Sequence, residues 1–215
     1  MLQRAVILLF IAFLVGFSVA ASDEAEEKEE LKVGDPAPEF TLKDADDKEY
    51  SLELLLDKEK GSAKVIILIM GDRKARKQGD EWAIELDKIY GKKEEVAILM
   101  VADLRGLPFF VTEGMVKWGV KREKLPVPIL LDWGGKVNQS YKTQKGKPDL
   151  FIVDSDGKIS YHQVGKYSDK LIKEVRAKVE DSLKEKEVKR QTSSMTDKAP
   201  SSHGGMRFIT VWSLL

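Results

Sequence analysis

Four cationic side chains stand close together at one point of the sequence, directly after a strongly apolar run. The run is KVIILIM, residues 64–70, and the cations are Arg73, Lys74, Arg76 and Lys77, which we call the cation cluster. Apolar residues at helical spacing follow, so the cluster is predicted to lie between a buried strand and the start of a helix. The N–H groups at a helix N-terminus attract negative charge, and arginine donates bidentate hydrogen bonds. Residues of this type at this place could therefore bind an anion.

The sequence leaves two alternative interpretations of the cation cluster open. A helix N-terminus already carries about half a positive charge, so further cations there are slightly unfavourable, and their long side chains can simply extend into water, where salt screens them. A Schiff-base role for Lys74 or Lys77 would require a lysine of depressed pKa in a dry pocket. Neighbouring cations favour such a shift, but nothing in the sequence indicates that either lysine is buried.

The composition excludes several kinds of chemistry. No cysteine occurs among the 215 residues, which removes thiol redox catalysis, disulfides and thiolate metal sites. The only histidines are His162 and His203, so we expect no histidine zinc site, no other metal and no cofactor. Lys plus Arg number 36, as do Asp plus Glu, so the overall charge identifies no partner. We predict no nucleic-acid partner, and any recognition by charge must come from a local patch.

The first 21 residues have the layout of a secretory signal peptide. One cation, Arg4, precedes an apolar stretch and then small residues, with cleavage expected after Ala20 or Ala21. The apolar run also reaches the short end of the roughly 17–25 residues that span a bilayer, so an uncleaved membrane anchor is the alternative. We therefore expect a periplasmic or secreted protein, which contacts a membrane only through this segment if it is uncleaved.

Composition divides the rest of the chain into a linker, a domain and a tail. Residues 22–31 are dense in carboxylates and should form a solvated acidic linker. Residues 32–185 have a globular pattern. Residues 186–215 are polar and Ser-rich, which predicts disorder, and they end in the short apolar stretch MRFITVWSLL. That stretch could dock on the domain, bind a partner or be an aberrant end of the reading frame.

Strand patterns alternate with helix patterns along the globular part. Asp44, Asp46 and Asp47 lie between two short strand patterns; they lack the Gly and the distal Glu of an EF-hand, so a plain turn is predicted and not a calcium site. Ser51 and Ser168 are the predicted N-caps of two helices. Further strands are predicted in KVIILIM, EVAILMVAD, VPILLD and, as a hairpin, LFIVDSDGKISYHQV. Helices are predicted in SLELLLDKEKG, KQGDEWAIELDKIYG, LPFFVTEGMVKWGV and SDKLIKEVRAKVEDSLKEKEVKR, the third of which has Pro108 near its start. This order predicts an α/β domain with a mixed central sheet flanked by helices.

Several single residues outside the cation cluster are expected to have structural roles. His162 lies in a predicted strand and is expected to be structural or exposed. Trp118 and Trp133 are predicted to pack against the core. Asp103 and Arg105 follow a strand, where ligands often bind in α/β sheets, but a local salt bridge is the simpler expectation.

Two long stretches resemble redoxins, the alkyl hydroperoxide reductase/thiol-specific antioxidant (AhpC/TSA) family. Residues 31–52, LKVGDPAPEFTLKDADDKEYSL, resemble the family's opening "vGdpAPdFtL", and residues 127–159 resemble its second half. The resemblance covers roughly residues 31 to 185. The spacing that makes it specific involves Tyr141, Gly146, Pro148, Phe151, Asp154 and Gly157.

The resemblance implies a thioredoxin-like fold with an N-terminal hairpin extension. It also implies that Pro148 is the cis-proline that faces the active-site loop in that fold. The loop around Pro148 carries Lys145 and Lys147, so these two lysines would join the cation cluster and six cations could converge on one candidate anion-binding face.

The chain departs from the family at the residues that carry its chemistry. In the thiol-disulfide branch the equivalent strand leads to a Cys-x-x-Cys motif that opens a helix, and Lys74 and Lys77 occupy those two positions. Lysine has no comparable redox chemistry, so no catalytic residue is assigned. The chain resembles a cysteine-free exported branch of the family.

These observations lead to one function hypothesis and two rivals. The hypothesis is a non-catalytic binding or interaction module, which holds a small anion or an acidic protein partner on the basic face at the former active site. The first rival is a thiol-disulfide oxidoreductase or peroxiredoxin-type antioxidant activity that persists by another route. The second is a membrane-anchored structural protein.

Overall fold

The computed structural model describes residues 31–57 and 63–196, with side chains up to residue 184. The predicted signal peptide lies outside the described residues, as do nearly all of the predicted acidic linker and the apolar C-terminal stretch. None of the helices in the described part of the chain combines the length and the apolar character that crossing a bilayer requires.

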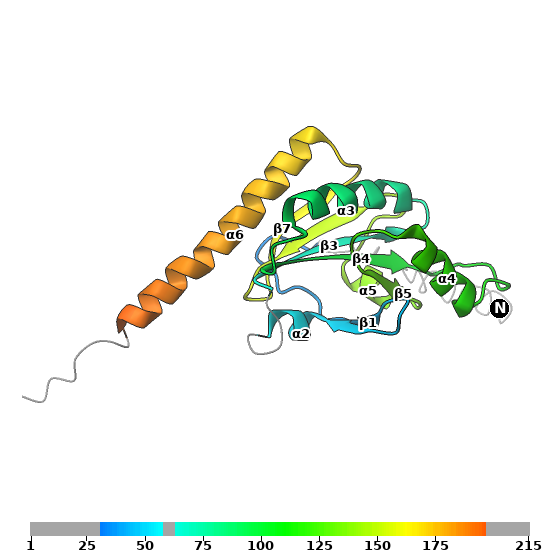
Figure 1. Cartoon of the computed structure of the whole chain (residues 1–215), viewed down its shortest axis with the longest axis horizontal. Helices are drawn as coiled ribbons and strands as arrows, with labels where there is room; N and C mark the ends of the chain where they lie inside the picture. Colours follow the sequence, from blue (N-terminus) through cyan, green and yellow to red (C-terminus); the bar gives the residue numbers. More distant parts are fainter. Residues whose placement is uncertain (1–30, 58–62, 197–215) are drawn as a thin grey trace, which may run out of the picture. The chain divides into compact units, whose positions relative to one another are not determined.

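A five-stranded mixed sheet in the order β5-β4-β3-β6-β7 forms the centre of the domain (Figure 1). A separate two-stranded hairpin, β1-β2, precedes it in the sequence. The strands are β1 Thr41–Lys43, β2 Glu49–Ser51, β3 Val65–Asp72, β4 Val96–Asp103, β5 Ile129–Asp132, β6 Asp149–Val153 and β7 Ile159–Val164. The helices are α2 Leu52–Leu56, α3 Arg76–Tyr90, α4 Glu113–Glu123, α5 Lys136–Ser140 and α6 Asp169–Thr196. The predicted α/β class with a mixed sheet flanked by helices is thus confirmed.

The apolar run before the cation cluster forms β3, the central strand of the sheet. β3 pairs in parallel with β4 and antiparallel with β6, so it has a neighbouring strand on both sides. Its first six residues are buried, because both faces of the sheet are covered. A continuous β-branched and apolar sequence is what such a position requires.

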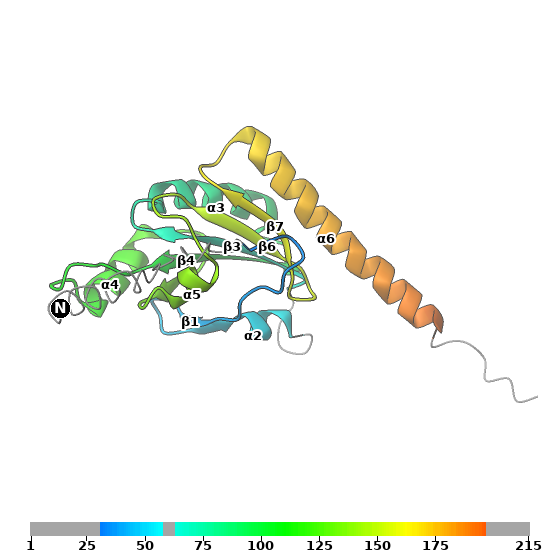
Figure 2. The same cartoon turned by 180° about the vertical axis from the view of Figure 1, so that it is seen from behind.

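The two faces of β3 belong to two separate hydrophobic clusters. Val65, Ile67 and Ile69 pack with side chains of α3 and α6, whereas Ile66 and Leu68 pack with the segment that leads into the hairpin and with α2. Alternate residues of a strand point to opposite faces, which is why neighbours in the sequence enter different clusters. The sheet therefore lies between two layers, with α3 and α6 over one face and the hairpin, α2 and α5 at the other (Figures 1 and 2).

The Asp-rich segment between β1 and β2 is a turn, as predicted. The carboxylate of Asp44 accepts hydrogen bonds from the backbone N–H groups of Asp46 and Lys48, at 2.8 and 3.0 Å. The next acidic side chains form ion pairs with α4, Asp46 with Lys121 and Asp47 with Lys117, both at 2.5 Å. These carboxylates therefore close the turn and link it to α4.

The predicted N-caps are confirmed at two helices. The Ser51 hydroxyl accepts a hydrogen bond from the Leu54 N–H at 3.1 Å, and that of Ser168 accepts one from the Leu171 N–H at 3.3 Å. Helix α6 then buries Val175 and Val179 against the sheet.

The structure corrects two helix boundaries and adds one helix. The helix predicted to begin near Pro108 begins at Glu113, because the hydroxyl of Thr112 caps it by accepting a hydrogen bond from the Met115 N–H. Helix α6 continues to Thr196, beyond Arg190, where the predicted helix ended, and so includes part of the stretch that was predicted to be disordered. Helix α5 was not predicted, and the buried carboxylate of Asp132 accepts a hydrogen bond from the Asn138 N–H within it.

Candidate functional site

The carboxyl ends of β3 and β4 lie side by side at one edge of the sheet. The two strands are parallel, and Asp72 at the end of β3 is in register with Asp103 at the end of β4. The segments that leave these strands therefore start next to each other. Ligands in open α/β sheets bind outside the carboxyl ends of the strands, which makes this edge the first place to look for a site.

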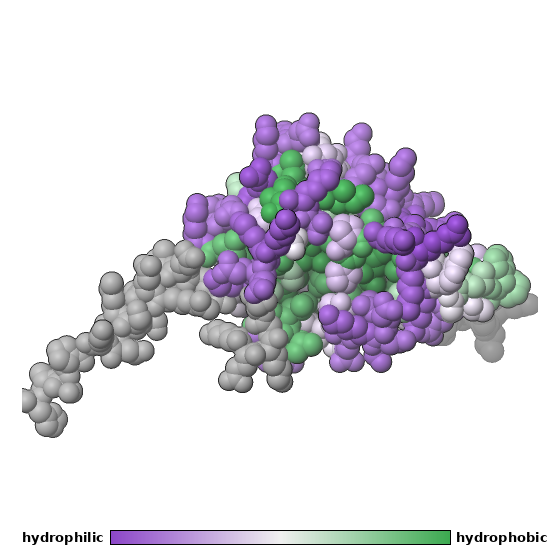
Figure 3. Space-filling model, viewed as in Figure 1, coloured by the Kyte–Doolittle hydropathy of each residue, from purple (hydrophilic) through white to green (hydrophobic). Residues whose placement is uncertain are grey.

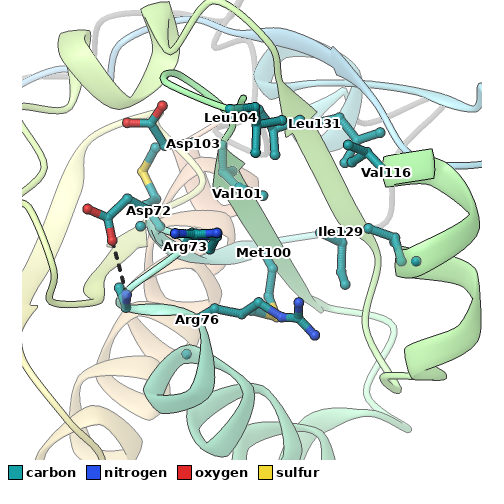
Figure 4. A pocket seen from close by; sticks show the side chains of 18 of the residues that line it. Asp72, Arg73, Arg76, Met100, Val101, Asp103, Leu104, Val116, Ile129 and Leu131 are labelled. Carbon is teal, nitrogen blue, oxygen red and sulfur yellow. Dashed lines mark hydrogen bonds between the residues drawn. The ribbon is translucent and has the colours of Figure 1, made fainter. Parts of the chain in front are cut away.

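A cavity of about 260 Å³ opens at this edge (Figure 4). Its polar wall comes from the β3–α3 connection and the first turn of α3, which contribute Arg73 and Arg76. Its apolar wall comes from the strand ends and α4, and includes Met100, Val101, Leu104, Val116, Ile129 and Leu131. The cavity thus combines an apolar interior with guanidinium groups, a combination that suits a ligand with both an anionic and an apolar part.

Asp72 ties together the two segments that carry the predicted cations. One carboxylate oxygen accepts hydrogen bonds from the backbone N–H groups of Lys74 and Ala75, at 2.8 and 3.0 Å, and a bond from Asp72 to this turn is drawn in Figure 4. The other oxygen accepts one from the Gly146 N–H at 3.0 Å. Gly146 lies between Lys145 and Lys147, so the structure does bring the loop before Pro148 to the turn that bears the cation cluster. No pattern in the sequence singled out Asp72.

The six predicted cations do not have equal access to the cavity. Arg73 and Arg76 line it. The remaining four, Lys74, Lys77, Lys145 and Lys147, are not among its lining residues and lie at or near the surface. Two of the six predicted cations therefore contribute to the wall of the cavity. Whether the candidate anion-binding face binds an anion remains a prediction.

Arg76 is also paired with two carboxylates. Its guanidinium forms an ion pair with Glu123 of α4, and its Nε lies 4.0 Å from the Asp80 carboxylate one turn along α3. Burial raises the pKa of both Asp80 and Glu123, and the nearby Arg76 charge opposes the shift in each case. Both acids line the cavity, and neither was predicted from the sequence. The i, i+4 spacing from Arg76 to Asp80 was visible in the sequence, whereas the contact with Glu123 depends on the packing of α4.

The first turn of α3 has no side-chain cap and no acidic residue of its own. The N-cap is Ala75, which supplies no side-chain hydrogen bond. The N–H groups at this end are therefore not capped by the Ala75 side chain, and the cations next to them increase the local positive potential.

Asp103 and Arg105 form the local salt bridge that was expected. The Arg105 Nε donates to the two carboxylate oxygens of Asp103 at 2.9 and 3.0 Å, and the Arg105 backbone N–H donates to one of them at 3.0 Å. Burial opposes ionisation of Asp103, but the hydrogen bonds and charge of Arg105 outweigh it and lower the pKa of the carboxyl below its ordinary value.

The prediction that Pro148 follows a cis peptide bond is wrong. No cis peptide bond occurs in the described ranges, 31–57 and 63–196, so the Lys147–Pro148 bond is trans. The trans form is the favoured state of an X–Pro bond by about 0.5–1 kcal/mol, and only the family resemblance suggested otherwise. Pro148 nevertheless lines the cavity, so its predicted position beside the turn holds.

His162 makes the structural contacts that were expected of it. Its Nε2 lies 3.0 Å from a carboxylate oxygen of the buried Asp149, and its ring stacks on Phe151 with a centroid separation of 4.1 Å. The prediction that Trp118 and Trp133 pack against the core is wrong, because both are exposed. Val116 and Val120 form the face of α4 that packs against the core, and Trp118 lies off that face.

The arrangement defines a thioredoxin-like protein that has no thiol at the carboxyl ends of β3 and β4. The profile of the AhpC/TSA family matches residues 33–162, and the chain belongs to that family. A thiol-disulfide oxidoreductase, ResA of Bacillus cereus, is 30% identical over 165 residues, which cover 77% of this chain and 88% of the relative.

Solved structures share the fold at lower identity. The C-terminal domain of a proposed thiol-disulfide oxidoreductase from Bacteroides thetaiotaomicron superposes with a TM-score of 0.54 at 22% identity, over 70% of this chain and 97% of that one. A proposed thioredoxin from Neisseria meningitidis superposes with a TM-score of 0.52 at 25% identity, over 68% and 91% of the two chains. The predicted thioredoxin-like fold and family are confirmed.

Proposed function

We propose that this chain is an exported, non-catalytic binding member of the AhpC/TSA family. It holds a small anion, or an acidic segment of a partner, at the edge where the thiol-disulfide branch of the family carries Cys-x-x-Cys. The observation that carries the proposal is the cavity of about 260 Å³ beside the cation cluster, in a chain that has no cysteine. A lined cavity without a thiol retains a means of binding but lacks the group that disulfide exchange requires.

Arg73 is the side chain we expect to contact the anion. It lines the cavity, is exposed, and forms no ion pair with another residue in the described part of the chain. Arg76, by contrast, is already shared between Glu123 and Asp80, so a ligand would have to compete with them. An arginine can bind a carboxylate or phosphate with two parallel hydrogen bonds, which a lysine cannot do.

The acidic neighbours limit the reach of the positive potential. Asp72, Asp80, Asp103 and Glu123 all line the same cavity as the two arginines. Such a mixture of charges does not produce a broad positive potential, so we expect the cavity to select its ligand through direct contacts. The apolar wall then favours a ligand in which the anionic group adjoins an apolar body.

The test is thermal unfolding of the chain that begins at Ser22, with a panel of small anions at constant ionic strength. The panel contains phosphate, sulfate, acetate and longer alkyl and aryl carboxylates. A ligand present at about 100 times its Kd should raise the Tm by roughly 5–10 °C. In a variant with all four residues of the cation cluster changed to alanine, the shift should be absent.

The matched control removes the same charge far from the cavity. Four exposed cations of α6 are changed to alanine for this purpose: Lys170, Lys173, Arg176 and Lys178. This control should keep the ligand-induced shift. If both variants lose the shift equally, or if no anion raises the Tm of the unchanged chain, the proposal is wrong and the cation cluster is a solvated turn.

Family membership supports one rival function, a redox activity that does not depend on a cysteine of this chain. The relative from Bacillus cereus carries the name of a thiol-disulfide oxidoreductase, which is why this rival is tested. Insulin reduction and peroxide consumption by the pure protein would reveal it. Turnover above the buffer rate that is lost when the cation cluster is changed to alanine would overturn the non-catalytic proposal.

Export is the part of the proposal that depends on residues 1–21. Sequencing the N-terminus of the protein recovered from its native host distinguishes cleavage after Ala20 or Ala21 from an uncleaved anchor. A protein that keeps residue Met1 and resists salt extraction from membranes would instead support the membrane-anchored structural alternative.

A further inference from the structure

Four large apolar side chains are exposed together beside the start of α4. Phe109 is 100% exposed, Trp118 64%, Phe110 63% and Met115 55%, and we call these four residues the aromatic tip. Half of the exposed large hydrophobic residues in the described part of the chain occur in this one short stretch. In Figure 3, where hydrophobic residues are green, an apolar projection stands at the right-hand edge, where Figure 1 draws the loop that precedes α4.

Local hydrogen bonds hold the tip in this exposed position. The Val111 N–H donates to the Pro108 carbonyl at 2.9 Å, which closes a turn around the two phenylalanines. The Thr112 hydroxyl then starts α4. Within that turn the rings of Phe109 and Phe110 pack edge to face on each other, with centroids 5.7 Å apart. Their exposure therefore follows from a defined backbone conformation.

Helix α4 has one face toward the core and another toward solvent. Val116 and Val120 are partly buried and pack against the core, whereas Met115 and Trp118 face outward. The guanidinium of Arg122 lies over the Trp118 ring, 5.2 Å from its centroid. The outer face thus combines an amphipathic aromatic side chain with a cation at its edge.

We propose that the aromatic tip inserts into the interfacial layer of a phospholipid bilayer that contains anionic lipid. Tryptophan and other aromatic rings are favoured at the membrane–water interface, where the ring meets hydrocarbon and the polar edge meets headgroups. Arg122 would then lie at headgroup level with its apolar stem along the Trp118 ring. This inference does not require a ligand in the cavity, although Met115 also lines it, and it departs from the expectation that a membrane is contacted only through the N-terminal segment.

Two observations favour a bilayer over a protein partner. Phe109 projects with its whole side chain exposed, and a protein would need a matching pocket to receive it, whereas a bilayer interface accepts a projecting ring without shape complementarity. The apolar segment at residues 5–21 is the second observation, because it is predicted to direct the chain across a membrane, so the exported chain emerges beside a bilayer.

Cations near the aromatic tip are largely paired with acids of this chain, so the insertion of apolar side chains should be the main driving force for membrane binding. Lys117 and Lys121 are paired with Asp47, Glu113 and Asp46 of this chain. Arg122, which lies over the Trp118 ring, is therefore the cation of the tip that we expect to contact anionic headgroups. We expect binding to increase modestly with anionic lipid and to depend strongly on the two phenylalanines.

The experiment uses residues 22–196, which retain every residue of both hydrophobic clusters. Binding to vesicles of phosphatidylcholine with phosphatidylglycerol is measured by sedimentation, for the unchanged chain and for Phe109→Asp/Phe110→Asp. The control, Val33→Asp/Leu54→Asp, adds the same charge at two exposed apolar residues on other segments. All three proteins should unfold at similar temperatures, because none of the substituted side chains is buried.

The unchanged chain and the control should bind the vesicles, and the tip variant should bind at least roughly tenfold more weakly, because it places two charges where apolar rings would insert. Failure of the unchanged chain to bind would overturn the proposal and leave a protein partner as the occupant of the tip. Equal binding by the tip variant and the unchanged chain, or equal weakening of the tip variant and the control, would overturn it as well.

Discussion

The Asp72 carboxylate accepts a hydrogen bond from the backbone N–H of Gly146 at 3.0 Å, although the two residues are 74 positions apart in the sequence. The same carboxylate accepts two backbone hydrogen bonds from the turn that starts at Arg73. One acidic side chain thus holds two cation-bearing segments against each other. It also places a negative charge beneath them, which reduces the cost of gathering so many positive charges.

Replacing Asp72 should destabilise the fold and loosen the loop at Gly146. Asp72→Ala removes three hydrogen bonds to one carboxylate, and we expect the free energy of unfolding to fall by about 2 kcal/mol in denaturant titrations. Amide exchange at Gly146 should accelerate. Asp44→Ala, which removes only two local bonds in an exposed turn, is the control and should cost about 1 kcal/mol or less. Unchanged exchange at Gly146 would contradict the role given to Asp72.

Changing each of two glycines near the cavity to alanine should change the free energy of unfolding in opposite directions. A Cβ on Gly71 would lie 2.8 Å from the Cβ of Ala75, so Gly71→Ala should lower the free energy of unfolding by about 1–3 kcal/mol. A Cβ on Gly119, inside α4, would meet no heavy atom within 4 Å. Gly119→Ala should raise the free energy of unfolding by about 0.5–1 kcal/mol through helix propensity. Denaturant unfolding of both variants checks the pair, and a neutral Gly71→Ala would show that the turn relaxes freely.

The Asp103–Arg105 pair should make stability depend on acid. The pKa of Asp103 is lower in the folded chain than its ordinary value of 3.8, so protonation favours the unfolded state. The contribution of the pair to stability is therefore fully present above pH 3.8 and is lost as the pH falls through the lowered pKa. Arg105→Gln should raise the pKa of Asp103 toward 3.8, so the pair's contribution to stability should become smaller and the range of pH over which it is lost should narrow.

Carbon-detected NMR titration of the Asp103 carboxyl measures this effect directly. Lys117→Gln serves as the control, because Lys117 pairs with Asp47 and Glu113 and with neither member of the tested pair. That control should shift the titration of Asp47 and leave Asp103 unchanged. A titration of Asp103 that is the same with and without Arg105 would refute the assigned cause.

A cysteine introduced at the start of α3 should be more acidic than one introduced at its end. Lys77 lies in the first turn of α3 beside the rest of the cation cluster, and Lys88 in the last turn. The thiol of Lys77→Cys should have a pKa below the ordinary value of about 8.5, because the helix terminus and nearby cations stabilise the thiolate. The thiol of Lys88→Cys should not. The rate of alkylation as a function of pH reports each pKa without interference, since the chain has no other cysteine. Equal pKa values would mean that this edge has lost the electrostatics that activate a thiol.

Local sequence patterns predicted most of the helices and strands but not all of their first and last residues. The uninterrupted apolar run became β3, and the hydroxyls of Ser51 and Ser168 start α2 and α6 as expected. The predicted start of α4 near Pro108 was too early, because the side chain that caps the helix is Thr112. The five-residue α5 was missed because the buried Asp132 supports it, and a helical pattern does not reveal such a contact.

The fold class, the family and the absence of a thiol followed from the order of the amino acids, because hydrophobic periodicity, family motifs and composition are properties of the chain alone. The folded structure was needed to show that Arg76 is paired with Glu123, whereas Arg73 is not paired with an acid of the described chain. It was also needed to show that Gly146 meets Asp72 and that Trp118 faces solvent. Each of these depends on how segments distant in the sequence approach one another. No local pattern encodes such an approach, because it is set by the packing of α4 and of the loop before Pro148 against the carboxyl ends of β3 and β4.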